Sequence, residues 1–202
     1  MSGLFSPQLF EGRTVLITNA GDWARPLADA FSRGGAKVKL AADEAAIDTP
    51  AIAETFDAAE MELGPVDILI NGPAPRAEGG AEDITLADWR AVTAPGYDGV
   101  FLRCAEFARR RIAAEGRGWV VNLMETPGPA GHAAGIAAAA GVANLVKTLG
   151  AEWARDGIRV NGLSARDWSG ASEQSLVAMT LYLCSPYSGF VTASLLEIDS
   201  DA

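Results

Sequence analysis

The stretch VLITNAGDWARPLADAF, from Val15 to Phe31, decides the fold. Its first three residues form a short apolar run, which is typical of a strand buried on both faces. The residues from Asp22 to Arg33 follow a helical period that ends at a pair of glycines. A buried strand, a turn and a helix in this order form the layout of a nucleotide-binding first unit. The turn, however, holds Asn, Trp and Arg where such turns are usually rich in glycine.

The same alternation of strand and helix continues outward from this stretch. It predicts an α/β fold, with a Rossmann-like doubly wound parallel sheet and helices on both faces. The 202 residues are expected to form one domain, 1–202. The predicted strands are Thr14–Thr18, Ala36–Ala41, Val66–Asn71, Trp119–Leu123, Ile158–Gly162 and Ser194–Asp199, and the predicted helices are Asp22–Arg33, Thr49–Leu63, Asp98–Ala114, Ala133–Arg155 and Ser172–Cys184.

Charge and composition exclude several classes of protein. With 26 acidic and 16 basic residues, the net charge of −10 disfavours nucleic acid and anionic lipid as partners. No run reaches the roughly 18 apolar residues of a membrane span, and the first residues do not resemble a signal peptide, so a cytoplasmic protein is expected. One histidine and two distant cysteines, Cys104 and Cys184, do not match a metal-site spacing, so no metal is expected.

Five segments resemble the short-chain dehydrogenase/reductase family, whose members are Rossmann-fold enzymes that use NAD or NADP. The resemblance covers nearly the whole chain. Its most specific segment is AAGVANLVKTLGAEWARDGIRVN, and the other four are EGRTVLIT, GPVDILIN, GWVVNL and GFVTASLLEID.

The phosphate-binding turn departs from the family pattern T-G-x-x-x-G-x-G. Its three glycine positions hold Asn19, Trp23 and Arg25. An indole at Trp23 takes up room that the backbone needs to approach a pyrophosphate, and Asp22 places a carboxylate where an N-cap belongs. We therefore expect no cofactor to bind at these three positions, although Arg25 could attract a phosphate.

The catalytic tetrad of the family is also missing from the matching positions. The family's Tyr and Lys correspond to Gly135 and Ala139, and its Ser corresponds to Glu125 or the adjacent Met124. The relay Asn aligns near Gly96. Because these glycines and alanines have no ionisable atoms, the resemblance predicts no proton relay and hence no catalytic residues of the usual kind.

Two ligand-binding parts of the family are shortened in this chain. The segment between Leu40 and Ile52 is too short for the helix and strand that usually flank the adenine. The segment from Asn161 to Ser172 is too short for the substrate lid. The sheet and its main helices are kept, which favours a protein retained for its shape.

These departures lead to the expectation of a non-catalytic subunit, similar to inactive subunits of heteromeric members of the family. Such a subunit would bind no NAD or NADP itself and would associate with an active paralogue in a heterodimer or heterotetramer. The expected contacts are helices 98–114 and 133–155 and the segment 172–199. Its role would be structural within an alcohol or hydroxyacyl dehydrogenase complex.

Two alternatives remain open from the sequence. Glu125 and His132 could form the dyad of a cofactor-free enzyme, since His132 is the one histidine of the chain. The chain could also be a homo-oligomeric scaffold or a ligand-binding protein.

Overall fold

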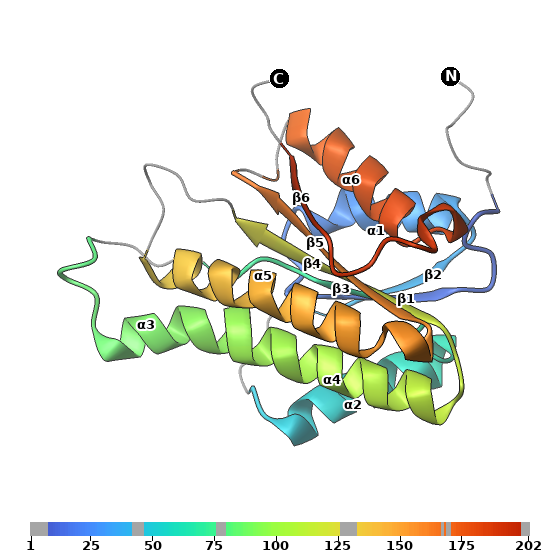
Figure 1. Cartoon of the computed structure of the whole chain (residues 1–202), viewed down its shortest axis with the longest axis horizontal. Coiled ribbons are helices and arrows are strands. Elements are labelled where there is room, and N and C mark those ends of the chain that lie inside the picture. Colours follow the sequence, from blue (N-terminus) through green and yellow to red (C-terminus); the bar gives the residue numbers. More distant parts are fainter. Residues whose placement is uncertain are drawn as a thin grey trace.

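The computed structural model describes residues 8–41, 47–75, 80–125, 133–166, 168 and 171–198. Figure 1 shows a parallel sheet with helices on both of its faces. The strand order is β2-β1-β3-β4-β5-β6, and all neighbouring pairs are parallel. The strands are β1 (Thr14–Thr18), β2 (Lys37–Leu40), β3 (Ile68–Asn71), β4 (Gly118–Glu125), β5 (Ile158–Ala165) and β6 (Leu195–Ile198). The predicted doubly wound fold is confirmed.

The described residues form six helices and three short turns, η1 to η3. Helices α1 and α6 pack on one face, and α2, α4 and α5 lie on the other (Figure 1). The helices are α1 (Ala24–Arg33), α2 (Thr49–Leu63), α3 (Leu86–Thr93), α4 (Gly99–Ala113), α5 (Ala133–Glu152) and α6 (Ala171–Leu183), and the turns are η1 (Ala94–Asp98), η2 (Ala154–Asp156) and η3 (Pro186–Ser188).

Each face of the sheet has its own apolar core, because both faces of the strands are covered. Leu16, Leu69 and Val120 belong to the core under α2, α4 and α5, whereas Ile17 and Ile70 belong to the core under α1 and α6. The residues of strands β1, β3 and β4 are therefore almost continuously buried. This explains why their sequences are apolar runs rather than alternating patterns.

Helix α3 was not predicted from the sequence. Thr85 begins it with a reciprocal cap, in which the Thr85 side chain accepts from the Asp88 amide and the Asp88 carboxylate accepts from the Thr85 amide. The helix continues through the wider turn η1 into α4, and Pro95 lies inside that turn. The predicted helix Asp98–Ala114 corresponds to α4, and the sequence did not predict that η1 joins this helix directly to α3.

The chain is shorter than the family pattern directly after the edge strand β2. It pairs with β1 alone, and its outer residues are exposed. Asp48 then caps α2 by accepting a hydrogen bond from the Ala51 amide at 2.9 Å. The sheet thus ends one strand beyond β1, as the short segment after Leu40 predicts.

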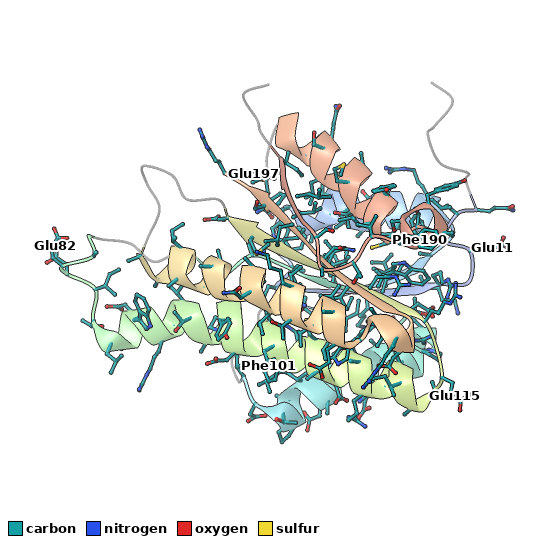
Figure 2. The ribbon with its side chains drawn as sticks, in the orientation of Figure 1. Glu11, Glu82, Phe101, Glu115, Phe190 and Glu197 are labelled. Atoms are coloured by element: carbon teal, nitrogen blue, oxygen red, sulfur yellow. The ribbon has the colours of Figure 1, made fainter. Side chains whose placement is uncertain are left out.

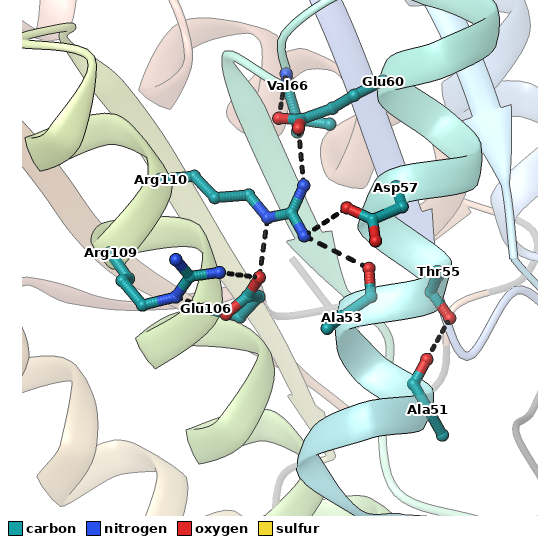
Figure 3. A network of polar contacts seen from close by, with 9 residues as sticks. All are labelled: Ala51, Ala53, Thr55, Asp57, Glu60, Val66, Glu106, Arg109 and Arg110. Atoms are coloured by element: carbon teal, nitrogen blue, oxygen red, sulfur yellow. Dashed lines mark hydrogen bonds and ion pairs between the residues drawn. The ribbon is translucent and has the colours of Figure 1, made fainter.

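A salt-bridge network joins α2 to α4 on the outside of the sheet (Figure 3). The Arg110 guanidinium donates to Asp57, Glu60 and Glu106 at 2.7, 2.6 and 2.6 Å. Arg109 also donates to Glu106, at 2.9 Å from Nε. We call these five residues the Arg110 network.

Helix α5 is long and apolar enough to cross a membrane by length and composition. It packs on β4 and β5 within the fold, and Val142, Val146 and Leu149 lie in the core. Its apolar character is therefore that of a core helix. The prediction that residues 1–202 form a single domain stays a prediction.

Candidate functional site

The carboxyl ends of β1 and β3 form the point at which the topology of the sheet reverses. The chain leaves β1 through α1 toward β2, and it leaves β3 through α3 and α4 toward β4, on the other face. In open α/β sheets, such a point opens a crevice in which ligands bind. The turn between Thr18 and Ala24 lies at this crevice.

Trp23 fills the crevice between the ends of β1 and β3. A Cβ added to Gly72, just after β3, would lie 2.5 Å from Cζ2 of the Trp23 indole. The same Cβ would lie 2.9 and 2.7 Å from the carbonyl oxygens of Thr18 and Asn19. The indole therefore packs directly on the Gly72 backbone, and Asn19 turns the chain with a φ of 49°.

The first turn of α1 differs from the expectation at Asp22. The helix begins at Ala24, Trp23 occupies the N-cap position, and no side chain caps the helix. The Ala24 and Arg25 amides donate to the carbonyls of Gly21 and Asp22 at 3.0 and 3.4 Å, and Pro26 has no amide hydrogen. Asp22 does not cap because the turn places it one residue too early.

A groove of about 990 Å³ opens on the α6 side of this turn. The turn, the exposed side of α1 and the end of β2 form one wall, and α6 forms the other. Its charged lining residues are Arg25, Arg33, Asp22, Asp29 and Glu173, and its other lining residues are Ala20, Gly21, Pro26, Leu40, Gln174, Val177, Ala178 and Leu181.

A buried polar network ties the carboxyl ends of β1 and β3 to the middle of β4. The Asn71 side chain accepts from the Thr18 hydroxyl at 2.9 Å and from Nε of Arg103 at 3.1 Å, and it donates to Asn122 Oδ1 at 2.8 Å. Cys104 lies beside it, 3.4 Å from Asn71 Nδ2. We call Thr18, Asn71, Arg103, Cys104 and Asn122 the Asn71 network.

The Asn71 network is closed to solvent. All five side chains are almost fully buried. Burial raises the pKa of Cys104 to about 12, and the nearby Arg103 charge only partly opposes this. The network holds the strand ends in place and is not itself a binding surface.

The four residues aligned with the family tetrad come together in space. Gly96, Glu125, Gly135 and Ala139 all line one cavity of about 20 Å³ at the end of β4. This is room for about one water molecule. Gly96 is required for the close packing here, because an added Cβ would lie 2.4 Å from Cβ of Ala74.

A larger cavity of about 220 Å³ adjoins the first and shares Glu125 with it. Ser164 and Glu197, which are register partners on β5 and β6, also line this cavity. Sequence reasoning missed both residues. The signal available to it was their position at the carboxyl ends of two predicted strands. The other lining residues are Met124, Ile136, Ala139, Ala140, Ala143 and Leu195.

His132, the proposed dyad partner of Glu125, lies outside the described residues. Two interpretations stay predictions. One is a degenerate tetrad at Gly96, Glu125, Gly135 and Ala139. The other is a degenerate phosphate loop at Asn19, Trp23 and Arg25. The expected absence of a metal stays a prediction as well.

Comparisons with known proteins identify the family. The family model described as Enoyl-(Acyl carrier protein) reductase matches residues 10–168, which is more than half of the 202 residues. The chain belongs to the short-chain dehydrogenase/reductase family. This family is one of oxidoreductases, as the resemblance at the sequence level implied.

Three similar proteins are informative about this family. D-Threitol dehydrogenase of Mycolicibacterium smegmatis is 28% identical over 76% of this chain and 69% of its own length. Galactitol 2-dehydrogenase (L-tagatose-forming) of Cereibacter sphaeroides is 28% identical over 94% of each chain. A putative NAD(P) dependent gluconate 5-dehydrogenase from Beutenbergia cavernae, solved with bound NADP, has a TM-score of 0.83 at 21% identity and covers 96% of this chain and 98% of its own.

These findings overturn the expected function. The prediction of a non-catalytic subunit of a hetero-oligomeric complex is wrong, because the similar proteins are named as dehydrogenases. The alternatives of a cofactor-free enzyme and of a scaffold or ligand-binding protein are wrong for the same reason.

The expectation of no cofactor is also wrong, because the family points to a nucleotide and a protein of the same fold was solved with bound NADP. The residues present fit such a group on one side of the β1–α1 turn. Trp23 covers the crevice over Gly72, whereas the groove of about 990 Å³ is lined by Gly21 and Arg25 of the same turn. The Arg25 side chain is the group that could hold a phosphate there.

The expected contact surfaces with another subunit stay predictions, as does the cytoplasmic location. Phe101 and Ile112 on α4 are each 43% exposed, and Figure 2 shows Phe101 projecting outward from that helix. Single exposed apolar side chains of this kind are common on soluble proteins.

Proposed function

We propose that this protein is a nucleotide-linked oxidoreductase that acts on a small polyhydroxylated molecule. The observation that carries the proposal is the convergence of Gly96, Glu125, Gly135 and Ala139 around one cavity that opens beside a second, carboxylate-lined cavity. The names of the similar proteins, which act on threitol and galactitol, support the same substrate class.

The nucleotide is assigned to the groove between α1 and α6. Gly21 and Arg25 line its end nearest to the strand termini, and Leu40 lines it at the end of β2. When bound, NAD or NADP supplies the hydride acceptor or donor. Arg25 acts here as a charged donor to phosphate, which is the role that Arg geometry suits best.

The substrate is assigned to the cavity of about 220 Å³. Glu125, Glu197 and Ser164 provide oxygens that accept hydrogen bonds from neighbouring hydroxyl groups. Ile136 and Leu195 provide apolar surface for the carbon chain. A small apolar cavity with a few polar groups of this kind is typical of a small-molecule site.

Glu125 is assigned the proton transfer. In the oxidation direction, the hydroxyl proton of the alcohol would pass to the Glu125 carboxylate. The carbon that bears this hydroxyl group would give up its hydride to bound NAD or NADP, and its C–O bond would become C=O. Gly135 and Ala139 offer no acid or base, so Glu125 is the titratable side chain of the described lining of that small cavity. A carboxylate within hydrogen-bonding reach can act as a general base.

The test has two measurements. Calorimetry with NADH and with NADPH measures binding to the purified full chain, and we expect a micromolar Kd for one of them and a weakening of about 5-fold in Arg25→Gln. Arg90→Gln, which changes an exposed arginine on α3, is the matched control.

The second measurement is dinucleotide reduction at 340 nm with threitol, galactitol and gluconate. We expect Glu125→Gln to lower the rate by at least 100-fold without a change in the Kd of the dinucleotide, because a general base contributes about 10²–10⁴-fold. Full activity in Glu125→Gln would exclude the proton role. The absence of dinucleotide binding below 1 mM would overturn the proposed function altogether.

A further inference from the structure

A further cavity lies at the opposite end of the sheet from the groove and the tetrad positions. It has a volume of about 450 Å³ and lies where β4 and β5 begin. In Figure 2, Phe190 marks this end of the molecule and Glu197 marks the other. The lining residues are Arg117, Trp119, Ala154, Arg155, Gly157, Arg159, Pro186, Gly189 and Phe190.

The charge of this cavity is opposite to that of the whole protein. Three arginines line it, and none of its lining residues is acidic. The chain as a whole carries a net charge of −10. A cationic cavity on an acidic protein focuses a local field that attracts small anions.

The walls of the cavity are held by hydrogen bonds and do not depend on a ligand. Arg159 donates from Nε to the Gly189 carbonyl at 2.8 Å and from Nη1 to the Ala154 carbonyl at 3.1 Å. Asn161 donates to the Val191 carbonyl at 3.0 Å and so holds the same loop on β5. A site that is ordered in advance loses little entropy when it binds a ligand.

Arg117 is positioned over the cavity by a glycine. Gly157 has a φ of +78°, and a Cβ there would lie 3.2 Å from Cγ of Arg117. The stem of Arg117 therefore packs on Gly157, while the residue as a whole remains exposed. Arg155 is 85% exposed at its side chain, and its contact with Asp156 is long, at 3.8 Å.

Aromatic surface lies beside these cations. Phe190 is fully exposed, at 101% of its reference area, which is unusual for the largest apolar side chains. Trp119 is 8% exposed, and Arg13 lies 5.1 Å from the centre of its ring. Pro186 also lines the cavity, so apolar surface lies next to the guanidinium groups.

We infer that this cavity is a second binding site, for a small aromatic anion whose phosphate or carboxylate group is carried on a flat ring. The anionic group is bound by Arg117 and Arg155, and the ring lies against Phe190 and Pro186. Arginine suits this role because its planar group binds oxyanions through paired donors and also stacks on rings. The site stands independently of the proposed function, since it shares no residue with the groove or the other cavities.

The experiment uses phenyl phosphate as the probe and follows backbone amide signals of the full chain by NMR. We expect saturable shifts at Gly157, Gly189 and Phe190, and a Kd that rises with ionic strength. Inorganic phosphate, which has no ring, and benzyl alcohol, which has no charge, should each bind at least 5-fold more weakly than phenyl phosphate.

The variants separate the two halves of the site. Arg117→Gln should weaken binding of phenyl phosphate about 5-fold, and Phe190→Ala about 3-fold. Both side chains are exposed, so both variants should keep the fold. The matched control Arg90→Gln, with an exposed arginine on α3, should bind like the parent.

Three outcomes would overturn the inference. Equal binding of benzyl alcohol would show that the arginines do not recognise a charge. Shifts confined to Gly21 and Arg25 would assign the anion to the groove, and this would leave the proposed nucleotide site intact. A sedimentation experiment in which the parent is a dimer and Phe190→Ala a monomer would assign this surface to contacts between copies of the chain.

Discussion

The Asn71 network and the Arg110 network both join elements that are distant in sequence, but they do so in opposite surroundings. The Asn71 network lies inside the protein at the strand ends, and its members are almost fully buried. The Arg110 network reaches from the interior to the surface (Figure 3): the Glu106 side chain is 7% exposed, that of Arg110 16% and that of Asp57 69%. A buried polar group that loses its partner cannot turn to water, whereas an exposed ion pair competes with water and salt throughout.

This difference in burial indicates which polar contacts determine the geometry of the site. The Asn71 network fixes the carboxyl ends of β1 and β3 against β4, next to the turn with Trp23 and the tetrad positions. The Arg110 network holds two helices against each other, away from these ends. The first should therefore affect both stability and the site, and the second should affect stability alone.

The largest expected effect comes from Asn71→Ala. It removes the partner of the Thr18 hydroxyl and of the Asn122 carbonyl in a buried setting, so we expect unfolding to be easier by about 3 kcal/mol. Urea denaturation followed by circular dichroism measures this change. The exposed Asn144→Ala on α5 should change stability by less than about 0.5 kcal/mol.

Thiol reactivity provides a second measurement on Asn71→Ala. Burial raises the pKa values of both Cys104 and Cys184, so both should react slowly with a thiol reagent at pH 8. In Asn71→Ala, Cys104 should be modified faster than in the parent, whereas Cys184 should change less. Equal acceleration of the two thiols would mean that the variant opens the whole molecule rather than the network.

Next in size is Gly72→Ala, which tests the packing of Trp23. The added methyl group would overlap the indole and two carbonyl oxygens, so we expect a loss of about 2 kcal/mol. Trp23→Ala in the same chain should recover part of this loss, because the indole is the closest of the three neighbours. Strictly additive effects in the double-mutant cycle would contradict the contact.

Arg110→Met should have a smaller effect, of about 1 kcal/mol at low salt. The loss should shrink further in 1 M NaCl, because screening weakens the parent's ion pairs. The buried stem is kept by methionine, so the change reports on charge rather than on packing. A loss that does not depend on salt would show that the network acts through packing.

We also expect Arg110→Met to change the stability of the protein at acidic pH. Hydrogen bonds from Arg109, together with the contacts of Arg110, hold the pKa of Glu106 below its ordinary value of 4.5. A carboxyl group with a lowered folded pKa stabilises the protein above its unfolded pKa, and this contribution is lost as pH falls from about 4.5 toward the folded pKa. Arg110→Met should therefore lose less stability than the parent over that acidic range.

Thr85→Ala should have the smallest effect, at about 0.5–1 kcal/mol. It removes the cap of α3, which is exposed and distant from both networks. Thermal unfolding measures it, and Thr85→Ser is the matched control, because it keeps the hydroxyl that accepts from Asp88. A loss as large as that of Asn71→Ala would contradict the distinction between buried and exposed polar contacts.

Much of the fold was predictable because its signals are local. The strand at Thr14–Thr18 and the helix at Thr49–Leu63 were predicted with the observed boundaries, since an apolar run and a capped, proline-started helix carry their own limits. Helix α3 was missed although Thr85 and Asp88 form a capping pair that is visible in the sequence. Its direct continuation through η1 into α4 depends on packing that no local pattern records.

The sequence predicted which positions belong to the candidate site but not the function of these positions. The sequence pattern aligned Gly96, Glu125, Gly135 and Ala139, and these residues do line one cavity. It did not indicate that Ser164 and Glu197 would join them, because that requires the register of β5 and β6. It also led to a wrong conclusion about the cofactor.

The sequence by itself determined the alternation of strands and helices, the family and the identity of the altered positions, because these depend on residue types along the chain. The tertiary structure alone decided that Trp23 packs on Gly72, that a groove remains on the α6 side of its turn, and that three arginines surround a cavity at the far end of the sheet. Those features arise where separate segments meet in space. Their geometry depends on how the sheet brings the segments together and not on any one of them.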